Sequence, residues 1–207
     1  MKIRQRAART LALATAAASI VLAPVAAAAS SAGQQAQPGF LAPQDLPPHP
    51  HSAWYAEPAT EGLPDAPTYC LEDVLPTEGA HHRLFRTDLD TSAEQITVRT
   101  AGVGEARALA ASARESVRGC AAATEEQDAG AEAEFRDYGH VDVQEGAHVY
   151  GIDTAYDSGS SDAHLFGVGR DGRTVTVVTW GQLGDLSQAP VEAFRGTTRT
   201  AVEKLRR

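Results

Sequence analysis

Residues 163–181 read as a β-hairpin, and no other segment restricts the possible folds as strongly. Two runs rich in Val, Thr and Phe flank Asp171-Gly172, a pair that favours a two-residue type I′ turn. With these two residues as the loop, the facing pairs are Arg170 with Arg173, Val168 with Val175, Phe166 with Val177, and His164 with Thr179. The opposite face carries Leu165, Gly167, Thr176, Val178 and Trp180. Because both faces are apolar, we expect a central hairpin with helices over one face and partial cover over the other.

Hydrophobic periodicity predicts the elements around this hairpin. Alternating apolar and polar residues indicate half-exposed strands at 82–88 and 95–100. Residues 132–138 and 139–156 supply two or three further strands, with Gly146 as the turn. The order of strands in the sheet, beyond the hairpin itself, is not fixed by these patterns.

Two amphipathic helices are predicted, over residues 105–123 and 190–206, because apolar residues recur there at helical spacing. Residues 40–69 contain seven prolines together with Phe, Leu, Trp and Tyr residues. Prolines interrupt regular hydrogen bonding whereas large aromatic residues favour burial, so this segment is expected to be an extended arm lying across the domain. The predicted fold class is therefore α+β, a mostly antiparallel sheet with two packed helices and a Pro-rich N-terminal arm.

The N-terminus indicates export. Four basic residues within the first ten precede an Ala-, Leu- and Val-rich stretch that ends in Ala27-Ala28-Ala29, the pattern of a secretory signal peptide over residues 1–29. A membrane anchor is the alternative, since the apolar run approaches spanning length. Cleavage is favoured by the small-residue site and by Pro24. Residues 30–39 then form a flexible tether, and residues 40–207 form the folded domain of a secreted, extracellular protein.

The charge of the exported protein excludes some partners. Residues 1–29 contain four of the 18 basic residues and none of the 27 acidic ones, which leaves a net charge near −13. Nucleic acids and anionic membranes bind clustered Lys and Arg. We therefore expect no nucleic-acid partner, and no stable membrane anchor after cleavage.

Cys70 and Cys120 are the two cysteines of the chain. An isolated pair in an exported protein favours a disulfide. Closing a loop of about 50 residues would stabilise the fold by roughly 4 kcal/mol in the chain-entropy treatment. Thiol catalysis or a Cys-based metal site is the alternative, although the C-x-x-C spacing is absent.

Three histidines are weak candidates for a metal site. His140, His148 and His164 fall on strands that can be neighbours, and Asp142 shares a face with His140. Such a set matches the ligands of zinc and other transition metals. The alternative is that each is an ordinary strand histidine, so we expect no metal and no cofactor.

Motifs for catalysis are not recognisable. The serine cluster at 158–161 does not match the G-x-S-x-G elbow of α/β-hydrolases, although a triad built from distant residues stays open. Asp88 and Asp90 form an acid pair of the kind used in glycoside hydrolysis, or else a solvated edge. We assign no catalytic residue. An apolar ligand cleft would draw on aromatic residues that the core also uses, namely Trp54, Tyr55, Tyr150, Tyr156 and Trp180.

The chain resembles the PknH-type extracellular sensor domains over roughly residues 38–207. The residues that carry the resemblance are Leu46-Pro47 and Trp54 of the arm, Cys70, Phe85, the Cys120 helix, Val149-Tyr150-Gly151, the hairpin, and the closing helix with Phe194. The resemblance implies a mixed α/β domain with a broad cleft for an unidentified extracellular ligand and no established catalysis. Such domains often carry two disulfides, whereas this chain can form one, and no kinase segment accompanies it.

These observations favour a secreted, non-catalytic ligand-binding or sensor-like domain of the cell envelope or the extracellular medium. Its partner would be a small extracellular ligand or an envelope protein. Two alternatives stay open, a secreted hydrolase with an unrecognised site and a protein-interaction module that uses the Pro-rich arm.

Overall fold

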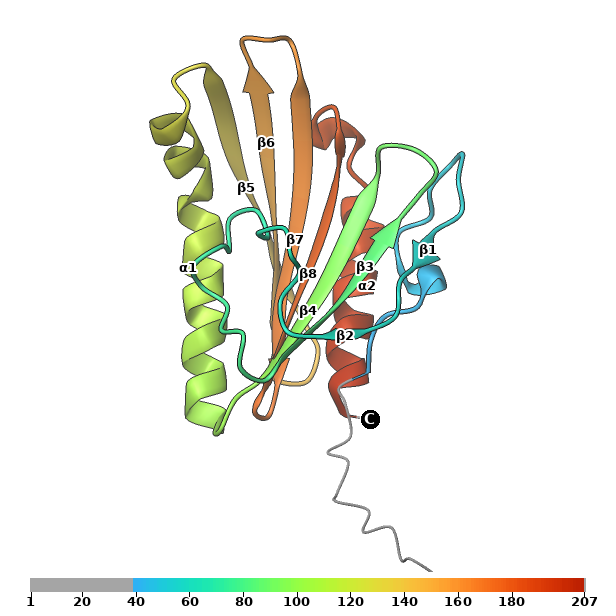
Figure 1. Cartoon of the computed structure of the whole chain (residues 1–207), viewed down its shortest axis with the longest axis vertical. Coiled ribbons are helices and arrows are strands. Elements are labelled where there is room, and N and C mark those ends of the chain that lie inside the picture. The colour runs from blue at the N-terminus through green and yellow to red at the C-terminus, as the bar shows by residue number, and fades with distance from the viewer. Residues whose placement is uncertain (1–38, 207) are drawn as a thin grey trace, which may run out of the picture. The chain divides into compact units, whose positions relative to one another are not determined.

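A computed structural model of the protein describes residues 39–206, which form one antiparallel sheet with a helix on each face (Figure 1). The predicted signal peptide lies outside the described residues, as does the predicted tether apart from residue 39. The sheet has eight strands in the order β1-β3-β4-β8-β7-β6-β5, and β2 also pairs with β3. This arrangement confirms the predicted α+β class. No helix within residues 39–206 is long and apolar enough to cross a membrane.

Six of the eight strands follow predicted segments with altered ends, and the two short strands at 55–56 and 60–61 lie in the arm, where no strand was predicted. The strands are β1 (Tyr55–Ala56), β2 (Thr60–Glu61), β3 (Ala80–Arg86), β4 (Ser92–Arg99), β5 (Ala131–Val141), β6 (Ala147–Tyr156), β7 (Ser161–Asp171) and β8 (Thr174–Leu183). The helices are α1 (Val103–Gln127) and α2 (Val191–Glu203), with 3-10 turns η1 (Pro43–Asp45), η2 (Leu186–Gln188) and η3 (Lys204–Arg206). Residues 131–141 form a single strand, because a β-bulge between Asp137 and Gly139 shifts the register without ending the strand.

The central hairpin is present, but its predicted turn is displaced by one residue. Asp171 pairs with Thr174, so the loop consists of Gly172 and Arg173. Gly172 has a φ of 56° and Arg173 has no positive φ, as a type II′ turn requires, whereas the predicted type I′ turn needs two positive values. Val168 consequently faces Val177 rather than Val175. A displacement of two partner positions leaves every side chain on its predicted face.

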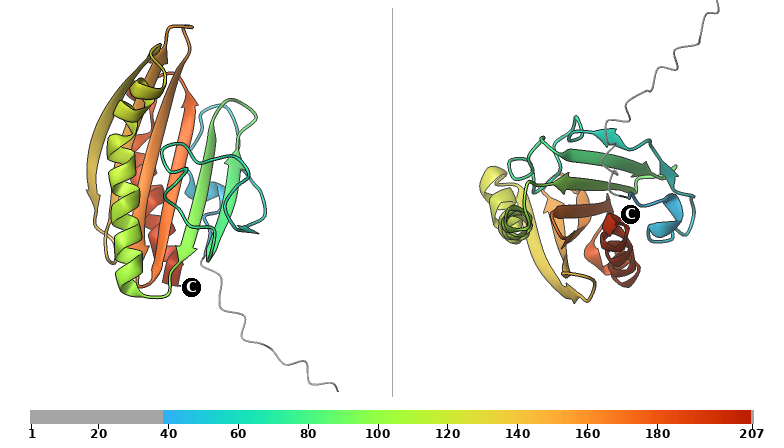
Figure 2. Two further views of the ribbon diagram at one scale, coloured as in Figure 1. Left: turned by 60° about the vertical axis from the view of Figure 1, so that its left-hand side comes forward. Right: turned by 90° about the horizontal axis from the view of Figure 1, so that it is seen from below.

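The two helices cover opposite faces of the sheet, which corrects the prediction that helices cover one face and leave the other partly open (Figure 2). On one face, Val117 of α1 belongs to the same buried cluster as Phe166 and Val168. On the other, Phe194 of α2 clusters with Leu165. Since both faces of the hairpin are apolar, each needs its own covering layer, and one helix supplies each.

The arm passes around the β3 edge from one face of the sheet to the other. Leu41 and Leu46 belong to the buried cluster on the α2 face, whereas Leu71 and Leu75 belong to the cluster on the α1 face. Between them the short strands β1 and β2 pair with β3. The arm therefore contributes to both halves of the core.

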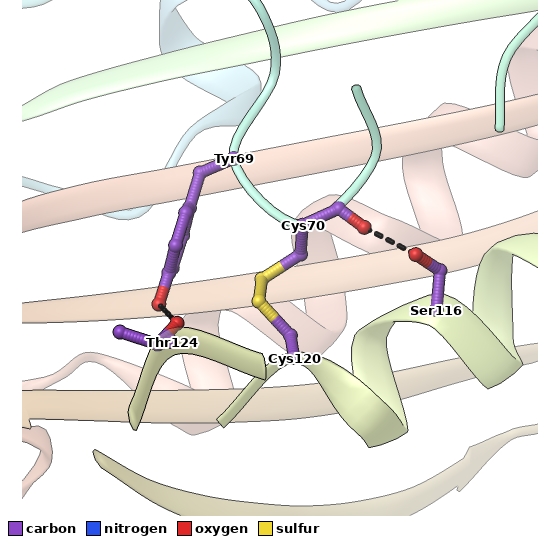
Figure 3. Close-up of a disulfide and its surroundings, with 5 residues drawn as sticks. All are labelled: Tyr69, Cys70, Ser116, Cys120 and Thr124. Atoms are coloured by element: carbon purple, nitrogen blue, oxygen red, sulfur yellow. Dashed lines mark hydrogen bonds between the residues drawn. A yellow bond between two sulfur atoms is a disulfide. The ribbon is translucent and has the colours of Figure 1, made fainter. Parts of the chain in front are cut away.

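A disulfide joins the end of the arm to α1 (Figure 3). Cys70 and Cys120 are bonded, with their Cα atoms 5.4 Å apart. The Ser116 hydroxyl donates to the Cys70 carbonyl oxygen at 2.5 Å, and the hydroxyls of Tyr69 and Thr124 are 2.8 Å apart. The predicted pairing is thus present, and it fixes the residues around Tyr69 against the helix.

Candidate functional site

A pocket of about 310 Å³ lies between the arm and the α1 face of the sheet. The arm contributes Glu57 and residues 67–69, and the remaining lining comes from β3, β4, β7 and β8. In Figure 1 the arm crosses in front of the sheet beside α1. This volume lies at the lower end of the range of small-molecule sites in proteins.

The register of the sheet places a row of side chains across the floor of this pocket. Leu84 of β3 faces Glu94 of β4, Glu94 faces Thr179 of β8, and Thr179 faces Phe166 of β7. Side chains that face one another across antiparallel strands share a side of the sheet. Two polar groups and one aromatic ring are thereby brought together from strands that are distant in sequence.

Glu94 is one of two acidic residues in the lining of the pocket, and Glu57 is the other. The Glu94 carboxylate accepts a hydrogen bond from the Thr68 hydroxyl, with oxygen–oxygen distances of 3.2 and 3.3 Å. Burial raises the pKa of Glu94 above its ordinary value, while the Thr68 bond and the charge of His82 act in the opposite direction. Within residues 39–206, no basic side chain forms an ion pair with this carboxylate.

His164 and two aromatic rings form one wall of the pocket. The ring of His164 lies 4.8 Å from that of Tyr69 and 6.3 Å from that of Phe166, centroid to centroid. Burial lowers the pKa of His164 below its ordinary value of 6.5, an effect that Asp162 partly opposes. The imidazole is therefore neutral at neutral pH. Tyr69 is held by its bond to Thr124 and by the adjacent disulfide (Figure 3).

The five aromatic residues proposed for a ligand cleft do not meet at one place. Tyr150 is fully buried in the cluster under α1, with its hydroxyl lacking a hydrogen-bond partner among the described residues. Trp180 is buried on the α2 face. Tyr55 is 44% exposed and donates to Asp88 at 3.1 Å, and Tyr156 is partly exposed near the β6–β7 turn.

Trp54 and Trp180 do share a second, smaller pocket. It has a volume of about 170 Å³ and is lined by Pro47, Pro48 and Pro50 of the arm together with residues of β8 and the β8–α2 connection. The indole nitrogen of Trp54 donates to the Pro47 carbonyl oxygen at 2.7 Å, which fixes the ring to the arm. Trp180 also borders the larger pocket.

The three candidate metal ligands are not brought together as one set. His148 Nε2 lies 2.6 Å from Asp137 Oδ1, and its ring stacks on Tyr150 at 4.5 Å. His140 faces His148 across β5 and β6, whereas His164 faces Gly181 and Ile152. Over residues 39–206, no three His, Cys, Asp or Glu side chains are grouped so that they could hold a metal ion. Asp142 is exposed in the β5–β6 turn.

The acid pair Asp88 and Asp90 supports the structure of a loop. Asp88 accepts from the Tyr55 hydroxyl, and Asp90 accepts from the backbone N–H of Leu183 at 3.0 Å. Both residues lie in the β3–β4 connection. Each carboxylate thus ties that connection to a neighbouring segment.

Sequence reasoning found His164 and Trp180 of the larger pocket but not Glu94, Thr68 or Tyr69. The predicted hairpin faces did place His164, Phe166 and Thr179 on one side, and that was the available signal. Glu94 was missed because the predicted strand began one residue later, at Gln95. Thr68 and Tyr69 lie in an irregular segment whose place in the fold no periodicity indicates.

The chain was compared with known protein families, with curated proteins and with solved structures, and it matches none of them.

Proposed function

We propose that this protein is a secreted, non-catalytic binding domain of the cell envelope or extracellular medium, and that it binds a small molecule in the pocket beneath the arm. The observation that carries the proposal is the lining of that pocket, which combines aromatic side chains, among them Tyr69, with a few polar groups, among them Glu94 and Thr179. Sites for small ligands typically combine apolar walls with a few polar groups that set orientation and specificity.

The rigidity of the walls supports this role. Tyr69 is fixed by Thr124 and by the disulfide, and Thr68 is bonded to Glu94. The pocket floor belongs to paired strands of the sheet. A site that is formed before binding loses less conformational entropy when the ligand arrives. The resemblance to PknH-type sensor domains agrees with a ligand-binding role and adds no catalytic step.

Export is part of the proposal. The disulfide fits an oxidising compartment, and the sequence before Ser30 fits a cleaved signal peptide. Mass spectrometry of the protein recovered from culture medium is expected to give an N-terminus at Ser30. Recovery of the uncleaved chain in the membrane fraction would instead support the anchor.

A thermal-shift screen tests binding, because a ligand of the folded state raises the melting temperature. The panel comprises cell-wall fragments, sugars, lipids, amines and divalent metals. Thr179→Phe fills the pocket from its floor, and Thr60→Phe places the same side chain on exposed β2 as the matched control. We expect a saturable shift that is lost in T179F and kept in T60F. A shift that survives T179F, or none with any compound, would contradict a ligand site here.

A further inference from the structure

We propose that the ligand of this pocket carries a positively charged nitrogen, which binds between the Glu94 carboxylate and the ring of Tyr69. This inference rests on the binding role proposed above and adds the chemical class of the ligand. It follows from the charges, the rings and the hydrogen bonds of the pocket.

Charge complementarity is the first argument. Glu94 lines the pocket and receives one side-chain hydrogen bond, from Thr68. None of the seven ion pairs within residues 39–206 includes Glu94, and the one charge that lowers the pKa of this carboxyl is that of His82. A carboxylate removed from water is unfavourable unless a cation or several donors offset the lost hydration. An ammonium group would be that cation, whereas a carboxylate or phosphate ligand would be repelled.

The aromatic walls are the second argument. The Tyr69 ring is partly exposed in the lining, whereas Phe166, whose ring centroid lies 6.2 Å from that of Tyr69, is fully buried and supports it from within the core. His164 contacts both rings. The negative face of an aromatic ring attracts a cation within about 6 Å of its centroid. Burial keeps His164 uncharged by lowering its pKa, so the imidazole adds to the wall without repelling the cation.

The other charged side chains of the lining do not cancel the negative charge of Glu94. Arg86 is the single Arg or Lys side chain in the lining formed by the described residues, and Glu57 stands opposite to it in sign. The Arg86 guanidinium lies 5.3 Å from the centroid of the Tyr55 ring, which is exposed and does not belong to the lining. The lining therefore contains two carboxylates, those of Glu57 and Glu94, and one guanidinium, that of Arg86. The net charge of −9 for the whole chain also favours the approach of cations.

Pairs of probes that differ in charge test the inference. Choline is compared with its uncharged isostere 3,3-dimethylbutan-1-ol, and benzylammonium with benzyl alcohol and benzoate, by titration calorimetry of the purified exported protein at pH 7.5. We expect each cation to bind saturably and at least tenfold more tightly than its uncharged counterpart, and benzoate to show no binding.

Four variants assign the effect to the pocket. Glu94→Gln keeps the size of the side chain and is expected to weaken cation binding at least tenfold, whereas Glu61→Gln on exposed β2 is the matched control and leaves it unchanged. Tyr69→Phe keeps the ring and retains binding, but Tyr69→Leu loses it severalfold. Melting temperatures measured on the same samples separate loss of binding from loss of folding.

The outcomes distinguish this inference from the binding role itself. If an uncharged or anionic probe binds as tightly as the cation, or if E94Q keeps full affinity, the cationic class is wrong while the pocket stands. If no probe binds, the cationic class is also wrong, and the wider panel and the T179F variant decide the binding role separately.

Discussion

Glu94 and His164 lie beside the same pocket, and burial moves their pKa values in opposite directions. Burial disfavours the charged form of each, so the pKa of the Glu94 carboxyl rises and that of the His164 imidazole falls. Each shift makes the free energy of unfolding depend on pH. At a pH between the folded and the unfolded pKa of one group, the folded and unfolded chains bind different numbers of protons. Burial of His164 therefore lowers the stability of the fold in mild acid, and burial of Glu94 lowers it near neutral pH.

His164 is expected to make the protein less stable in mild acid. Its pKa is lower in the folded chain than the ordinary 6.5, so the unfolded chain takes up a proton first, and stability falls as pH decreases from 6.5 through the folded value. Each unit of difference corresponds to about 1.4 kcal/mol. His164→Gln should remove this loss in urea unfolding between pH 5 and 8, whereas the exposed His51→Gln should keep it. An unchanged pH profile in H164Q would contradict the assignment.

Glu94 is expected to have the opposite effect. Its folded-state pKa lies above the ordinary 4.5, so stability declines as pH rises from 4.5 through the folded value. Glu94→Gln should therefore equal or exceed the wild type in free energy of unfolding at pH 7, by up to about 1 kcal/mol for a carboxyl that keeps some contact with water. The difference should vanish near pH 4. A destabilised E94Q at pH 7 would show that the carboxylate supports the fold, instead of being retained for binding.

Among the elements, β7 and α2 pack closely because β7 lacks side chains at two positions. A Cβ at Gly167 would collide with the Thr198 hydroxyl, and one at Gly169 with a methyl group of Val202. Gly167→Ala is therefore expected to destabilise the protein by about 1–3 kcal/mol through overpacking. Gly196 on α2 has nothing within 4 Å of an added Cβ, so Gly196→Ala should instead stabilise by up to about 1 kcal/mol. Chemical unfolding measures both, and equal effects would contradict this packing.

The disulfide connects the arm to α1, and its loss should affect both elements. Cys70→Ser and Cys120→Ser are each expected to lower stability by up to about 4 kcal/mol, the chain-entropy value for a loop of 50 residues. Ala122→Ser, on the exposed side of α1, introduces the same residue and should cost well below 1 kcal/mol. A free-thiol assay that finds two reactive cysteines in the native protein would contradict the bridge.

Most of these elements were predictable from local pattern, but their arrangement was not. The faces of the hairpin follow from the alternation around Asp171, and Cys120 falls on the buried side of α1 by helical spacing. The register depended on whether Asp171 or Gly172 began the turn, and the sequence suits both. The placement of the two helices on opposite faces depends on tertiary packing, which local sequence pattern does not reveal. The candidate site was mostly missed because Thr68, Tyr69 and Glu94 meet only after the arm has crossed the sheet.

At the scale of the whole molecule, the arm is tied to both the sheet and the C-terminal helix. The backbone N–H of Leu41 donates to Gln95 Oε1 at 2.7 Å, and its carbonyl oxygen accepts from Arg83 at 2.9 Å. The Thr197 hydroxyl of α2 donates to the Asp45 carbonyl oxygen at 2.6 Å. Contacts between residues so far apart in sequence require the closure of long loops, which costs conformational entropy. The same arm forms one wall of the pocket, so the fold and the proposed binding site share a segment.

Leu41 tests how far the core depends on the arm. The Leu41 side chain is fully buried. Leu41→Ala removes its apolar contacts and leaves a cavity, so we expect the free energy of unfolding to fall by about 2–5 kcal/mol. Leu89→Ala is the matched control, because Leu89 is 55% exposed and its truncation should cost below about 0.5 kcal/mol. Guanidinium unfolding gives both values. If L41A loses no more stability than L89A, the arm does not belong to the core. A loss in the expected range means that the arm belongs to the core, and that L41A should also bind pocket ligands more weakly.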